Sequence, residues 1–297
     1  MDTAIILAFS YNKNNLDTNR QHLPGILIDI YYAYSHVRQL TDEIVVITDL
    51  IMEGDISELK NSIVNSRVSI DILNLIDRLR ISNCLYEYTN KSSLISILKR
   101  LCHRKKHIFF YYTGHSLHGN ILLPTMNEYI CYNSDHPTDF TISFLILRDI
   151  FSLANSTAQI CVVLDCCGSR GLELPFVLNG DVYTLTPRSD KFFMPQQVIC
   201  FSASMSDEVS VASRGGSRFT YYFFKYLKEY RNVIKFKQFL VDVCSMGSSV
   251  TGGPGGSIGT GGSKEISQTP MVHATYPNMK LIWRWLHHND DIEVDLN

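Results

Sequence analysis

Residues 159–168 of the chain read Gln-Ile-Cys-Val-Val-Leu-Asp-Cys-Cys-Gly, an apolar run that ends in an acidic residue, two cysteines and a glycine. Such a short, continuous apolar run predicts a strand that is buried on both faces. A second run, from His107 to Thr113, has the same character and ends in Gly114, His115 and Ser116. Two buried strands that each end in a reactive side chain therefore set the expected fold and the place of the expected site.

Other segments extend this pattern along the chain. Apolar runs predict further strands at residues 4–9, 43–48, 197–202 and 280–285. Helical spacing of apolar residues predicts helices between them, at residues 25–40, 92–100, 143–154, 217–230 and 235–246. Strands that alternate with helices predict an α/β fold, in which helices cover both faces of a mostly parallel, six-stranded central sheet. Ligands of such sheets lie beyond the carboxyl ends of the strands.

Composition limits the class of protein. The 297 residues are 45% hydrophobic and 19% charged, which is enough apolar material for a large core and too little charge for a disordered chain. Lys+Arg is 27 and Asp+Glu is 29, so no basic excess indicates a nucleic-acid partner. The basic run at residues 103–107 is typical of a solvated helix end. No apolar stretch approaches the roughly 20 residues of a membrane span, and no secretory signal is evident, so we expect no membrane partner and a cytoplasmic location.

Eight cysteines invite the question of disulfides or metals. A long chain without a secretory signal favours a reducing compartment, where thiols are buried or reactive. No Cys-x2-Cys pair occurs, so the spacing is poor for a metal site.

His115 and Cys167 together indicate nucleophilic chemistry. A thiolate is the attacking form of cysteine, and it needs a base or a cation nearby. Loops that follow neighbouring parallel strands can bring a His and a Cys together, and a His about 50 residues upstream of a Cys is the caspase arrangement. Taken alone, each residue is also compatible with a structural role, a buried thiol or a hydrogen-bonded His.

The two strand ends resemble the motifs of metacaspases. Residues 111–116 are similar to the strand and Ser-Gly-His-Gly motif of that family, and residues 163–169 are similar to its Asp-x-Cys-His-Ser-Gly motif. Weaker similarities follow the family's order through nearly the whole chain, at residues 23–29, 171–176, 218–223 and 268–270.

The resemblance implies a caspase-like, three-layer α-β-α sandwich and a cysteine endopeptidase. Cys167 stands at the nucleophile position and His115 at that of the general acid/base, with a thioester acyl-enzyme as the intermediate. The backbone amides of Ser116 and Cys167 are the oxyanion-hole candidates. Cys166 is expected to point into the sheet, because adjacent residues of a strand alternate faces.

The resemblance also places Asp165, Asp29 and Thr113 in the pocket for the substrate side chain before the cut. Two carboxylates in a partly buried pocket favour a guanidinium or an ammonium, and Arg fits best because of its bidentate fork. Peptides or proteins with Arg or Lys before the cut are therefore the expected partners. Purely structural roles are also open, since Asp29 fits the first turn of a helix and Asp165 a strand-end turn.

The chain departs from the family at several positions. Gly168 stands where the family has His, Ser116 where it has Gly, and Ile26 where it has Cys. The acidic pairs that bind calcium in many metacaspases are missing from residues 119–124 and 142–145, and Glu173, with Asp181 farther on, is what remains. We therefore expect no metal or other cofactor, and activity that depends weakly or not at all on calcium.

The organisation of the chain follows from the same similarity. A match that extends from residue 4 to about 285 predicts one peptidase domain over residues 1–297, without a prodomain. The glycine-rich residues 247–263 predict a flexible loop insertion. Arg170, Arg188 and Lys191 lie between the cysteine strand and the next one, where self-cleavage is expected. The resemblance favours a monomer.

Three alternatives stay open at this point. The first is a catalytically inactive homologue that binds peptides or partner proteins. The second is a metal or redox site that uses His115, His118, Cys166 and Cys167. The third is another Arg-specific peptidase on the same fold, similar to legumain or gingipain.

Overall fold

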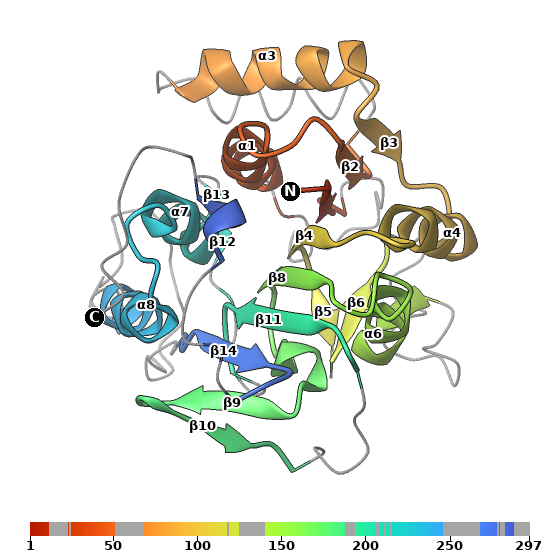
Figure 1. Cartoon of the computed structure of the whole chain (residues 1–297). Coiled ribbons are helices and arrows are strands. Elements are labelled where there is room, and N and C mark those ends of the chain that lie inside the picture. The colour runs from red at the N-terminus through yellow and green to blue at the C-terminus, as the bar shows by residue number, and fades with distance from the viewer. Residues whose placement is uncertain are drawn as a thin grey trace.

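The computed structural model describes residues 1–11, 23, 25–50, 68–117, 119–124, 140–187, 194–205, 208, 210, 212–213, 216–245, 268–277, 279 and 283–287. Its centre is a nine-stranded sheet with the order β10-β9-β14-β11-β8-β4-β1-β2-β3 (Figure 1). Six of these strands are parallel: β1 (Thr3–Ala8), β2 (Ile44–Thr48), β3 (Leu85–Glu87), β4 (His107–Thr113), β8 (Gln159–Asp165) and β11 (Gln197–Ser202). Three antiparallel strands extend the sheet beyond β11: β14 (Met271–Ala274), β9 (Phe176–Asn179) and β10 (Val182–Leu185).

Two apolar cores cover the two faces of this sheet. Alternate residues of β1 point to opposite sides, so Ile6 belongs to one core and Ile5 to the other. One core is completed by α1 (Ile26–Val37), α3 (Val68–Ile81), α7 (Arg218–Tyr226) and α8 (Val233–Ser245). The other core is completed by α4 (Lys91–Cys102) and α6 (Phe144–Phe151). The predicted three-layer α/β architecture with a mostly parallel sheet is therefore confirmed.

Smaller elements lie close to the expected site. The strands β5 (Ser116–Leu117), β6 (Asn120–Leu122) and β7 (Thr141–Ser143) form an antiparallel sheet directly after His115. The short strands β12 (Ala212–Ser213) and β13 (Gly216–Ser217) form a ribbon that leads into α7. The 3-10 helix η2 (Arg170–Glu173) follows β8. A second 3-10 helix, η4 (Arg284–Leu286), lies near the end of the described residues.

The strand count and the last strand differ from the prediction. The sheet has nine strands rather than six, because β3, β9, β10 and β14 are too short to stand out as apolar runs. The strand expected at residues 280–285 is wrong for the described part of that segment, which forms η4 from Arg284 onward. Trp283 and Trp285 stack there with ring centroids 5.7 Å apart, and the Trp285 Nε1 donates to Gln159 Oε1 at 2.7 Å. These contacts stabilise a turn at the start of β8.

Two further expectations can be placed against this fold. None of the helices within the described ranges has the length and apolar character to cross a membrane. The glycine-rich segment 247–263 lies outside the described residues.

Candidate active site

The register of the two central strands brings the predicted reactive residues together. Thr113, the last residue of β4, pairs with Asp165, the last residue of β8. The Gly114 amide then donates to the Asp165 carbonyl at 3.3 Å, which holds the two chain segments side by side beyond the sheet. His115 and Cys167 each follow their strand end by two residues, so they occupy equivalent positions at the same edge.

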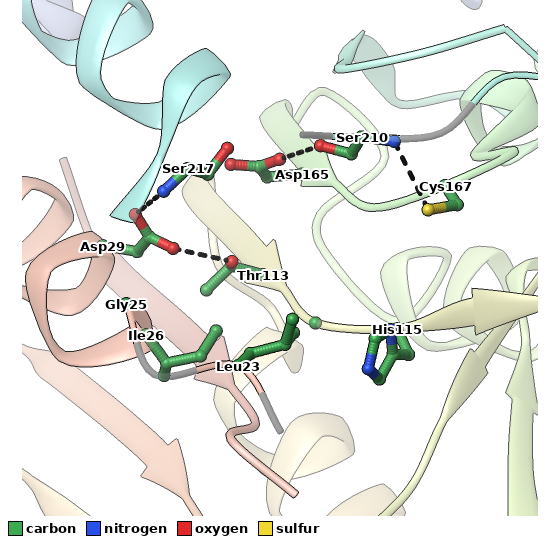
Figure 2. Close-up of a pocket in the computed structure, with 11 residues that line it drawn as sticks. Leu23, Gly25, Ile26, Asp29, Thr113, His115, Asp165, Cys167, Ser210 and Ser217 are labelled. Carbon is green, nitrogen blue, oxygen red and sulfur yellow. Dashed lines mark hydrogen bonds between the residues drawn. The ribbon is translucent and has the colours of Figure 1, made fainter. Parts of the chain in front are cut away.

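A cavity of about 100 Å³ lies at this edge. A single water needs roughly 10–15 Å³ by this measure, so the cavity has room for a side-chain head group. Its lining includes five of the predicted site residues: Asp29, Thr113, His115, Asp165 and Cys167. Figure 2 shows Asp29 on the left, Cys167 and His115 on the right, and Thr113 and Asp165 between them.

Cys166 and Cys167 face different surroundings, as predicted. Cys166 is fully buried in the core that α4 and α6 complete, whereas Cys167 is partly exposed and lines the cavity. All described cysteines are free thiols. The described residues contain no group of three His, Cys, Asp or Glu side chains that could hold a metal, and His118 lies outside them. The burial of Cys166 opposes the metal or redox alternative, because its side chain lies in the core and does not line the cavity.

Asp29 reaches the cavity from the first turn of α1, so it has the helix position predicted for it and also faces the site. Its side chain is 2% exposed. The Ser217 amide donates to Asp29 Oδ1 at 2.7 Å, and the Thr113 hydroxyl donates to Oδ2 at 3.3 Å. Burial and the neighbouring Asp165 carboxylate raise the pKa of Asp29 well above its ordinary value, although these two hydrogen bonds oppose the shift.

Asp165 is held by hydroxyl groups rather than by a cation. The Ser210 hydroxyl donates to Asp165 Oδ1 at 2.8 Å, and the Thr220 hydroxyl donates to Oδ2. Thr220 in turn shares a 2.5 Å hydrogen bond with the Tyr111 hydroxyl. Burial raises the pKa of Asp165, and the hydroxyl groups partly oppose it. Neither Asp29 nor Asp165 forms a salt bridge with any residue in the described ranges.

The Cys167 thiol is linked to the same group of contacts. The Ser210 amide donates to Cys167 Sγ at 3.3 Å, so Ser210 contacts the nucleophile candidate through its backbone and Asp165 through its side chain. Burial and the Asp165 carboxylate raise the pKa of Cys167, while the Ser210 amide lowers it. The balance therefore favours the thiol over the thiolate.

The two residues that supply the oxyanion-hole candidates, Ser116 and Cys167, contact each other. Ser116 donates its hydroxyl to the carbonyl oxygen of Cys167, which ties the His loop to the Cys loop. Ser116 does not have a positive φ, so its Cβ causes no backbone strain where the family has Gly. It does not line the cavity, whereas Cys167 does.

The predicted self-cleavage residues do not line the cavity in the described part of the chain. Arg170 lies in η2, and Arg188 and Lys191 fall outside the described residues. Sequence reasoning did not find Ser210, Ser217 or Thr220 as ligands of the two carboxylates. Thr220 lies inside the segment 218–223 that resembles metacaspases, but Ser210, in a loop, and Ser217, at the end of β13, belong to no sequence pattern.

Comparisons with known proteins add no residue to this description. No protein-family model matches the sequence, and no curated protein matches it. Among solved structures, the chain is similar to a protein of Geobacter sulfurreducens, with 11% identity, coverage of 92% of each chain and a TM-score of 0.45. It is also similar to caspase-1 from Spodoptera frugiperda, with 10% identity, coverage of 91% of this chain and 87% of that chain, and a TM-score of 0.47. The residues of the cavity are therefore interpreted from their own chemistry.

Proposed function

We propose that the chain is a metacaspase-like cysteine endopeptidase that cleaves peptide bonds after Arg or Lys. One observation carries this proposal: a single cavity is lined by a thiol, an imidazole and two buried carboxyls. The carboxyls form an acidic pocket for a cationic side chain, and a guanidinium can donate hydrogen bonds to both of them. The thiol and the imidazole lie at the opposite side of the cavity, where the scissile bond would follow that side chain (Figure 2).

The chemistry assigns one role to each group. Cys167 Sγ attacks the scissile carbonyl carbon, and its proton passes to the His115 imidazole. The tetrahedral oxyanion is stabilised by the amides of Cys167 and Ser116. His115 then protonates the leaving amine as the C–N bond breaks, which leaves a thioester on Cys167. Water hydrolyses the thioester, with His115 as its base, and the free thiol returns.

Occupation of the acidic pocket also supports activation of the thiol. Asp165 raises the pKa of Cys167 while its charge is uncompensated. A bound guanidinium compensates that charge, so the pKa of Cys167 falls when the correct substrate side chain is present. The raised pKa of Cys167 also favours the alternative of an inactive, peptide-binding homologue. The peptidase hypothesis and this alternative predict different reactivities of the Cys167 thiol.

The decisive experiment is a comparison of fluorogenic peptides with Arg, Lys, Asp or citrulline before the cut. We expect cleavage after Arg and Lys, little after citrulline or Asp, and none in Cys167→Ala. Labelling of Cys167 by an Arg-chloromethylketone separates the alternatives, because only an activated thiol beside an acidic pocket reacts quickly. Binding of the Arg peptide without cleavage or labelling would instead establish an inactive peptide-binding homologue.

We propose that this activity requires no calcium. Calcium prefers six to eight oxygen ligands, several of them charged, and the segments that supply them in the family lack acidic pairs here. The rate of Arg-peptide cleavage is therefore expected to be equal in EGTA and in millimolar calcium. Strong activation by calcium would contradict this prediction.

Self-cleavage is proposed at Arg170, Arg188 or Lys191, because a basic-specific site would accept each of them. Intact-mass analysis of the active enzyme and of Cys167→Ala, followed by Arg188→Gln and Lys191→Gln, identifies the position. A chain that stays at 33.9 kDa in active enzyme would exclude self-cleavage.

A further inference from the structure

Tyr11 lies directly against the predicted catalytic histidine. It follows β1, is 4% exposed and has a φ of 60°, which is unusual for a residue with a side chain. The carboxylate of Asp49, just after β2, holds this conformation, because it accepts from the Ser10 amide at 2.7 Å and from the Tyr11 amide at 2.7 Å. A buried carboxylate that binds two consecutive amides fixes where the Tyr11 side chain begins.

The hydroxyl of Tyr11 forms hydrogen bonds with the backbone of His115 and of Leu122. The His115 amide donates to Tyr11 Oη at 2.9 Å, and Tyr11 Oη donates to the Leu122 carbonyl at 3.0 Å. The Tyr112 hydroxyl donates to the His115 carbonyl at 2.5 Å. Burial raises the pKa of Tyr11 well above its ordinary value, so the hydroxyl keeps the proton that it donates. The two tyrosines therefore bind both backbone polar atoms of His115, its amide and its carbonyl.

The close approach of these hydroxyls explains Gly114. A Cβ on Gly114 would lie 2.6 Å from the Tyr112 hydroxyl and 3.0 Å from the Tyr11 hydroxyl. The chain can therefore place the tyrosine hydroxyls beside the residue before His115 only because that residue has no side chain.

The ring of Tyr11 also covers the imidazole. The two ring centroids lie 4.7 Å apart and the ring planes are inclined by 37°. An aromatic face limits the rotation of a neighbouring ring and attracts a cation through its quadrupole. The imidazolium that forms when His115 accepts the thiol proton is such a cation. One side chain thus holds the backbone of His115 through its hydroxyl and its imidazole through its ring.

We propose that Tyr11, anchored by Asp49, is the positioning residue that orients His115 for proton transfer. This inference rests on the proposed peptidase function, in which Cys167 and His115 are the reacting pair. Tyr11 is not among the residues that line the cavity. Its loss is therefore expected to slow the chemical step and to leave substrate binding largely intact.

Two substitutions separate the ring from the hydroxyl. In Tyr11→Leu, which loses both, we expect kcat for the Arg peptide to fall by about 10- to 100-fold while KM changes by less than about twofold. Tyr11→Phe keeps the ring and is expected to recover part of that loss. Asp49→Asn acts from outside the cavity and is expected to lower kcat in the same way, because one of its two acceptor oxygens becomes a donor.

Tyr183→Phe is the matched control. Its hydroxyl is also held by a backbone carbonyl, that of Met279 at 2.6 Å, but it lies in β10. A folded Tyr11→Leu whose kcat equals that of Tyr183→Phe would overturn the proposal while leaving the function intact, as would an equal rise in KM and fall in kcat. A wild-type enzyme that fails to cleave the Arg peptide would overturn the proposed function, and this inference with it.

Discussion

The carboxyls of Asp29 and Asp165 are buried together without a cation from the described chain, and this makes the site dependent on pH. Burial raises the pKa of both carboxyls, so they hold protons to a higher pH than an ordinary carboxyl does. A guanidinium binds best when both are ionised. We therefore predict that KM for the Arg peptide falls as pH rises through the raised pKa, by up to about tenfold per pH unit, the limit for one released proton.

The matched measurement is cleavage of the citrulline peptide at the same pH values. Citrulline is neutral, so its KM should lack this dependence although the peptide is otherwise the same size. A parallel pH dependence for both peptides would place the titration outside the acidic pocket.

Replacing Asp29 by Asn tests whether this buried carboxyl lowers the stability of the fold while it provides specificity for Arg. Because burial raises the folded pKa of Asp29, its favourable contribution to the free energy of unfolding is present at low pH and is lost as pH rises through that pKa. Asn keeps an acceptor for the Ser217 amide and never ionises. We predict that Asp29→Asn is more stable than wild type at pH 8, by about 1–3 kcal/mol in urea unfolding, and that KM for the Arg peptide rises at least about tenfold. A variant that is less stable at pH 8 would contradict the assigned cause.

Site residues at strand ends and at the start of a helix could be predicted from the sequence. Residues that are held in place by partners far away in the sequence could not. Cys167, His115, Asp29, Thr113 and Asp165 line one cavity because strand ends and the first turn of a helix have predictable places in an α/β fold. Tyr11 and Ser210 lie in loops whose conformation depends on distant partners, Asp49 and Asp165. No spacing within the sequence indicates such pairs.

At the scale of elements, the ribbon of β12 and β13 contacts Asp29 of the acidic pocket through β13. Gly216 in β13 has a φ of 90°, and a Cβ there would lie 2.7 Å from Asp29 Oδ1 and 3.1 Å from Ile28 Cγ2. We predict that Gly216→Ala displaces Asp29, raises KM for the Arg peptide several-fold or more, and destabilises the fold by more than the roughly 1–2 kcal/mol of a left-handed non-glycine residue.

Gly180→Ala serves as the control for this substitution. Gly180 also has a positive φ, of 58°, but nothing lies within 4 Å of a Cβ built on it. Its variant should show the conformational cost and an unchanged KM. Equal effects of the two substitutions on KM would show that Gly216 does not support Asp29.

The elements themselves were predictable where a continuous apolar run met a helical neighbour. The runs at 4–9, 43–48, 107–113, 159–164 and 197–202 all form strands of the central sheet. The hairpin of β9 and β10 escaped that criterion, because each strand has four residues and exposed positions. Its turn at Gly180 and Asp181 follows Asn179, a combination typical of two-residue hairpins. The strand predicted at 280–285 is wrong for its described part. Its two tryptophans stack on each other in a turn instead of pairing in the sheet.

At the scale of the whole molecule, the sheet ends at β10, and this edge bears on the oligomeric state. Val182 and Leu185 are each 66% exposed on this strand, so it offers both apolar side chains and unpaired backbone groups to a second chain. However, β10 has four residues and therefore extends roughly 13 Å. Pairing of two such strands buries far less than the roughly 1,200 Å² of a stable interface.

We therefore predict that the protein sediments as a monomer of 33.9 kDa at micromolar concentration. The active site supports the same expectation, because all five predicted cavity residues come from one chain and need no partner to complete the acidic pocket. Sedimentation equilibrium of Cys167→Ala, which excludes self-cleavage, gives the mass directly. A dimer that Val182→Lys dissociates would contradict the prediction and identify β10 as the interface, since a lysine on an edge strand opposes strand pairing.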